Sequence, residues 1–131
     1  MPVTLPNGIQ IFNATPHDLI FSDYSWEERD IIVPSEGFPI NAFAHNVEVG
    51  TVGPATLVTL NFTSREDGLE IIKLVREKYP NALIVGSVIA AQAYPEEVVA
   101  PIPRYRGDRG GKRSMQPLMK PDRFTIFLKE Q

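Results

Sequence analysis

The sequence predicts a single α+β domain spanning residues 1–131, and three observations support that class. Short apolar runs separated by Pro, Gly and Asn fill the first half, as is typical of several short strands. One strongly amphipathic helix is expected at 65–79. A fully apolar strand at 82–86 then leads through a Gly-Ser corner into a small-residue helix at 88–94, a pattern that indicates a buried centre.

The N-terminal third predicts antiparallel strands. Runs at 8–12 and 19–21 flank a Thr-Pro-His-Asp turn, so a β-hairpin is expected between them. A third strand is expected at 30–33, ended by Pro34, and Trp26 is expected to cover the sheet.

The middle of the chain predicts a βαβ unit with parallel strands and a right-handed crossover. It joins a strand at 56–62, the helix at 65–79 and the strand at 82–86. Thr63 and Glu66 have the spacing of a capping box at the start of the helix. A closing strand at 123–128 is expected to return to the sheet.

Composition and charge exclude several function classes. The chain has no cysteine, which excludes disulfides, thiolate metal sites and cysteine nucleophiles. Residues 104–123 hold seven basic and two acidic side chains, a net charge of +5, so the remainder carries −8 within the total of −3. This asymmetry indicates an anionic partner or an acidic neighbour for the basic segment, whereas the overall charge argues against a general nucleic-acid coat protein.

The start of the chain has no signal-peptide pattern, and no apolar run reaches membrane-spanning length. A cytosolic protein with no membrane partner is therefore the expectation.

Gly86 and Ser87 form the first candidate site. A strand that ends at Gly-Ser before a helix presents unpaired N–H groups and the positive end of a helix dipole, which suits a phosphate or a carboxylate. The alternative is that Ser87 only caps the helix. The spacing matches neither a dinucleotide fingerprint nor a P-loop.

The basic segment is the second candidate site. Arginine forks bind phosphate oxygens and stack on bases, and tyrosine offers a further stacking face. The residues with this chemistry are Arg104, Tyr105, Arg106, Arg109 and Arg113. The alternative is a solvated loop with no ligand.

The histidines carry weaker signals. His17 beside Asp18 invites a general-base interpretation, although neighbouring residues on a turn usually point apart and a structural turn is the alternative. His45 is isolated and is expected at the surface. No metal-ligand spacing is present, so neither a metal nor a cofactor is expected.

Three segments together resemble a group of small proteins found in phage and bacterial genomes. They are residues 11–17 (Ile-Phe-Asn-Ala-Thr-Pro-His), 34–37 (Pro-Ser-Glu-Gly) and 84–95, together 23 of the 131 residues. The chain departs from the usual Asn-Leu-Thr-Pro-His start in having Ala14. In size and pattern it is similar to the phage Thoeris anti-defence proteins. Those are oligomeric sponges that bind cyclic ADP-ribose isomers, and some bind cyclic oligonucleotides, without cleaving them.

This resemblance implies a non-enzymatic, homo-oligomeric protein that sequesters a cyclic nucleotide-like signal. Gly86 and Ser87 would then donate hydrogen bonds, the four arginines would hold phosphates, and Tyr94 or Tyr105 would lie against the base. One alternative is a phage structural or interaction protein that uses its basic loop at 104–113. A second alternative is a small hydrolase that uses His17 and Asp18.

Overall fold

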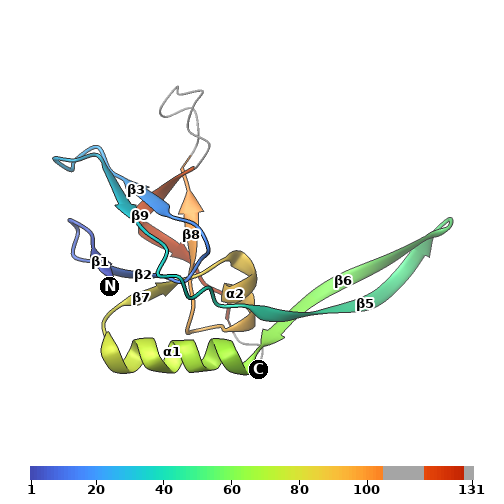
Figure 1. Ribbon diagram of the computed structural model, residues 1–131. Coiled ribbons are helices and arrows are strands. Elements are labelled where there is room, and N and C mark those ends of the chain that lie inside the picture. The colour runs from blue at the N-terminus through green and yellow to red at the C-terminus, as the bar shows by residue number, and fades with distance from the viewer. Residues whose placement is uncertain (105–116, 129–131) are drawn as a thin grey trace.

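The computed structural model describes residues 1–104 and 117–128, which form a two-sheet body with a long projecting β-hairpin (Figure 1). The predicted α+β class is confirmed, with nine strands and two helices over these residues. In chain order they are β1 (Val3–Thr4), β2 (Gln10–Asn13), β3 (Leu19–Ser22), β4 (Asp30–Val33), β5 (Ala42–Val52), β6 (Ala55–Ser64), α1 (Glu66–Lys78), β7 (Leu83–Val85), α2 (Val88–Ala93), β8 (Ala100–Pro103) and β9 (Leu118–Thr125).

The first sheet has the strand order β1-β2-β7 and holds the buried strand that the sequence predicted. β7 lies parallel to β2, with Phe12 opposite Ile84, and both of these side chains point into one core cluster. Ile11 and Val85 alternate with them and belong to the second core cluster. The sheet is therefore apolar on both faces, which explains the unbroken apolar run of β7.

The second sheet has the order β4-β3-β9-β8, and it corrects the predicted hairpin. β3 pairs with β4 in an antiparallel hairpin, whereas β2 belongs to the other sheet. The closing strand does return to a sheet, as predicted, between β3 and β8. It starts earlier, at Leu118, and ends at Thr125. Trp26 is half-buried against this part of the core, as expected.

The corner between β2 and β3 shows why the chain changes sheets instead of folding back on itself. Asn13 is fully buried, and its Nδ2 donates to the carbonyls of His17 at 2.8 Å and Val33 at 2.9 Å. Its Oδ1 accepts from both the backbone N and the hydroxyl of Thr15. One amide side chain thus fixes the whole corner and anchors it to β4.

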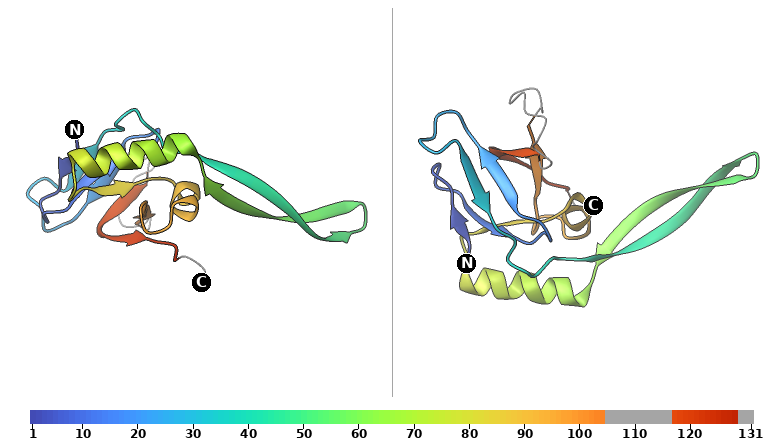
Figure 2. Two further views of the ribbon diagram at one scale, coloured as in Figure 1. Left: turned by 90° about the horizontal axis from the view of Figure 1, so that it is seen from below. Right: turned by 45° about the horizontal axis from the view of Figure 1, so that its top comes forward.

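β5 and β6 pair only with each other and form a twisted arm that extends away from the body (Figures 1 and 2). This corrects the predicted βαβ unit, because β6 and β7 do not share a sheet. The two-residue connection Gly53-Pro54, with Gly53 at φ 56°, brings β5 alongside β6 at once. The threonines of β6 also interrupt the continuous apolar run that a strand in a parallel, fully covered sheet requires.

α1 matches the predicted helix within one residue at each end, but its predicted cap is wrong. The N-cap is Arg65 and makes no side-chain capping bond, so the capping box of Thr63 and Glu66 is absent. Ile72 and Val75 form the buried side of this amphipathic helix, whereas Leu69 and Leu74 are exposed.

α2 follows β7 and is buried on one side only. Ala90, Ala91 and Ala93 pack in the core, whereas Val88 and Ile89 are about half exposed, so the predicted fully buried helix is only partly correct. The Ser87 hydroxyl accepts from the Ala90 backbone N at 3.0 Å, as an N-cap does.

Candidate functional site

The arm formed by β5 and β6 is the most distinctive surface of the described chain. Its strands are 11 and 10 residues long, and almost all of their side chains are exposed. Seven large apolar side chains of the arm are each between 45% and 65% exposed; they are Phe43, Val47, Val49, Val52, Leu57, Val58 and Leu60. Exposed apolar surface on this scale is typical of an interaction site.

The arm is nearly uncharged. Between residues 42 and 64, Glu48 is the only side chain with a formal charge. His45 lies on the surface as expected, and its Nε2 is 2.9 Å from the Thr63 hydroxyl across the ribbon. An uncharged surface with valine, leucine, phenylalanine and threonine suits a protein partner, not a polyanion.

A single buried residue fastens the arm to the body. Tyr94, only 2% exposed, accepts a hydrogen bond from the backbone N of Arg65 at 2.8 Å. Its hydroxyl donates to the carbonyl of Asn41 at 2.7 Å. Asn41 immediately precedes β5 and Arg65 immediately follows β6, so one hydroxyl connects both ends of the arm to α2. Ala42 and Phe62 add apolar contacts at the same base.

The sequence-predicted ligand residues at the Gly-Ser corner have structural roles. The N–H of Gly86 donates to the carbonyl of Val99, and the Ser87 hydroxyl caps α2. Tyr94 points its ring into the core. Their roles in ligand binding stay predictions, as do those of Tyr105, Arg106, Arg109 and Arg113, which lie outside the described residues.

Arg104 is the one residue of the basic candidate site that the structure describes, and it lies beside an aromatic ring. Its guanidinium carbon is 5.5 Å from the ring centre of Tyr24, and that of Arg29 is 4.1 Å from the same ring. The Arg104 Nε is buried and has no hydrogen-bond partner among the described residues. We call Tyr24, Arg29 and Arg104 the arginine–tyrosine cluster.

The loop that presents this cluster is held by Asp23. Its carboxylate accepts from the backbone N and the hydroxyl of Ser25, both at 2.8 Å. These hydrogen bonds hold the pKa of Asp23 below its ordinary value of 3.8, and the nearby charge of Arg104 lowers that pKa further. The cluster therefore combines two cations and a stacking face at one fixed position, which the sequence did not predict.

The His17–Asp18 corner is held in place by hydrogen bonds to neighbouring segments. The His17 carbonyl accepts from Asn13 and Thr15, and Asp18 Oδ1 accepts from the backbone N of Ser35 at 3.1 Å. These contacts support the structural alternative for this turn. No group of His, Cys, Asp and Glu suited to a metal ion occurs within residues 1–104 and 117–128. Over the same residues, no helix has the length and hydropathy needed to cross a membrane.

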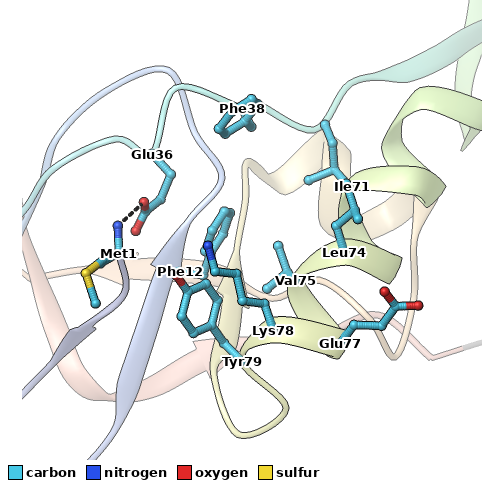
Figure 3. A pocket seen from close by; sticks show the side chains of 10 residues that line it. All are labelled: Met1, Phe12, Glu36, Phe38, Ile71, Leu74, Val75, Glu77, Lys78 and Tyr79. Carbon is cyan, nitrogen blue, oxygen red and sulfur yellow. Dashed lines mark hydrogen bonds and ion pairs between the residues drawn. The ribbon is translucent and has the colours of Figure 1, made fainter.

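A pocket of about 600 Å³ lies between the C-terminal half of α1 on one side and Met1, Phe12 of β2 and the segment 36–38 on the other (Figure 3). Its walls are mostly apolar, with the Phe12 and Tyr79 rings 6.5 Å apart. At its rim the N-terminal amine of Met1 contacts Glu36 Oε1 at 2.7 Å. The walls offer shape and apolar contact, and Glu36, Glu77 and Lys78 are the charged side chains among them.

The sequence itself contains a signal for the arm. Two runs rich in Val, Thr, Leu and Phe flank Gly53-Pro54, and such runs around a two-residue connection predict a hairpin. No known family model, curated protein or solved structure is significantly similar to this chain.

Proposed function

We propose that this chain is a non-catalytic interaction protein that joins a larger macromolecular assembly through its β5–β6 arm. The observation that carries the proposal is the arm itself, a long ribbon that packs on the body only at its base. Isolated two-stranded ribbons are marginally stable in water, so a ribbon of this length needs a surface to pack on. The seven exposed apolar side chains give it the composition of an interface core.

The remaining sites support a binding role more than a catalytic one. At the corner the Thr15 hydroxyl donates to the His17 carbonyl and Asp18 Oδ1 accepts from the backbone N of Ser35, and Ser87 caps a helix. A phage or prophage setting, which the resemblance at residues 11–17, 34–37 and 84–95 implies, is compatible with an assembly protein and forms part of the proposal.

Site-specific photo-crosslinking tests the interaction role. A photoreactive benzoyl-phenylalanine would replace Leu57 or Leu60 on the arm, or Leu74 on α1 as a control with similar or greater exposure. In bacterial cells that express the full chain, we expect discrete crosslinked species from the two arm positions and none from Leu74. An arm that crosslinks to nothing, or no more than Leu74 does, would contradict the proposal.

A second function, sequestration of a phosphate-bearing nucleotide-like ligand, is favoured by the arginine–tyrosine cluster. Two guanidinium groups beside Tyr24 provide the charge and the stacking face that a nucleotide needs, and the buried Nε of Arg104 lacks a partner among the described residues. This arrangement lies where the chain enters the basic segment.

A thermal-shift panel of cyclic ADP-ribose isomers, cyclic dinucleotides and ADP-ribose tests sequestration. Ligand at a hundredfold excess over its Kd stabilises the folded state by about 2.7 kcal/mol, which raises the Tm by several degrees. We expect Arg104→Ala to remove the shift and Lys73→Ala, an exposed cation on α1, to retain it. The ligand should be recovered intact. A panel without any shift, or a shift that persists in Arg104→Ala, would argue against this second function.

A further inference from the structure

The two edges of the arm differ in their capacity to pair with another strand. β5 contains an irregularity between Glu48 and Gly50, where Val49 has no partner on β6. A bulge and a charge are two devices by which proteins protect an exposed edge from pairing. β6 has neither, because residues 55–64 are uncharged, contain no proline and run in regular register on both sides of the bulge.

The arm is apolar on both faces. Residues directly opposite each other share a face, so Phe43, Val47 and Leu57 project from one side of the ribbon. Val58 and Leu60, with the partly buried Phe62, project from the other side. A ribbon that packed one face against the rest of the chain would be apolar on that face only, with the other face polar. Along the free edge of β6, apolar side chains therefore lie on both faces, Leu57 on one and Val58 and Leu60 on the other.

The charge of the arm indicates what covers it. A basic or acidic partner would find only Glu48 to pair with between residues 42 and 64. A second arm has the same neutral composition, the same free β6 edge and the same uncovered faces. Identical edges can pair about a twofold axis in antiparallel orientation, and this closed arrangement leaves only the protected β5 edges outside.

We infer that two copies of this chain associate by antiparallel pairing of β6 with the β6 of a second copy, which forms a continuous four-stranded sheet in the order β5-β6-β6-β5. This inference rests on the proposed interaction role of the arm and names its partner. The ten residues of β6 provide the pairing edge, and the exposed apolar side chains of the two β6 strands pack beside each other across the new pair.

Single cysteines provide a direct test, because the natural chain has none. In an antiparallel pair about a twofold axis, only residues next to the axis face their own copies closely enough for a disulfide. Each of residues 57–62 is replaced in turn by cysteine in the purified full chain, with Val49→Cys on the β5 edge as control. Mild oxidation should give disulfide dimers at one or two adjacent positions of β6 and none at Val49.

Charge variants and the molar mass in solution complete the test. Light scattering should give twice 14.6 kDa for the natural chain. Val58→Lys with Leu60→Lys should give monomers, whereas the matched pair Val47→Lys with Val49→Lys on β5 should retain the dimer. Circular dichroism and a melting curve check that each variant is folded.

The possible failures are distinguishable from one another. A natural chain that is monomeric, or that crosslinks through Val49 as readily as through β6, would overturn the β6 pairing. If that monomer still crosslinks to another protein through Leu57 and Leu60 in cells, the interaction role stands and only the identity of the partner is wrong. If the arm crosslinks to nothing in cells either, both proposals fail.

Discussion

Replacing Tyr94 with phenylalanine removes the hydroxyl that is hydrogen-bonded to both ends of the arm, while the ring still fills its place in the core. The ring remains, but the N–H of Arg65 loses its acceptor at 2.8 Å and the carbonyl of Asn41 loses its donor at 2.7 Å. Each hydrogen bond contributes about 1 kcal/mol net, and partly buried groups left without partners increase the cost. We therefore expect Tyr94→Phe to lower the free energy of unfolding by about 2 kcal/mol.

The assay is chemical denaturation, together with hydrogen exchange of the arm amides. A loss of about 2 kcal/mol corresponds to a decrease in Tm of roughly 8 °C for a chain of this size. Exchange should accelerate most at Ala42 and Phe62, which pack at the base of the arm. Tyr79→Phe is the matched control, because the Tyr79 hydroxyl makes no hydrogen bond among the described residues. A Tyr94→Phe variant as stable as the natural chain would refute the anchoring role.

Two further perturbations test the same neighbourhood and the arginine–tyrosine cluster. Gly68→Ala should destabilise the protein by about 2 kcal/mol or more despite the higher helix propensity of alanine. The new Cβ would overlap the Tyr94 hydroxyl and lie 2.6 Å from its Cζ, whereas Gly50→Ala, with nothing within 4 Å, should be nearly neutral in a melting curve. Because the folded-state pKa of Asp23 is depressed, its contribution to stability is complete above its ordinary pKa of 3.8 and is lost as the pH falls through the folded value. Asp23→Asn should therefore be less sensitive to acid below pH 4 than the natural chain, and equal acid sensitivity of the two proteins would contradict this assignment.

The parts of the fold that the sequence predicted well are those where a local pattern matches the local structure. α1 follows from its helical spacing, and β7 follows from an unbroken apolar run that is buried on both faces. The pairing of strands was not predictable in the same way, because it depends on contacts that the pattern does not encode. Asn13 determines the path from one sheet to the other through four hydrogen bonds, and its sequence neighbours suggested only a turn.

The arm differs from the sequence prediction for a related reason. The helix after the run at 56–62 favours a crossover unit, because a strand, a helix and a strand in that order are typical of one. The competing signal was the short connection at Gly53-Pro54, which lets β6 pair with its immediate predecessor. Local pairing closes a very short loop at little entropic cost, so it prevails over a crossover that spans a whole helix.

Tyr94 was first identified as a candidate face for a nucleobase, and the structure gives it a second assignment at the base of the arm. The two roles use different parts of the side chain. Stacking on a base would use the ring, which is buried in this structure and which Tyr94→Phe keeps, whereas anchoring uses the hydroxyl, which Tyr94→Phe removes. A variant that retains nucleotide-induced stabilisation but has a loosened arm would show that the hydroxyl holds the arm and that ligand binding does not need it. A Tyr94→Phe variant whose arm stays rigid would show that the hydroxyl does not link α2 to β5 and β6, which would contradict the anchoring role.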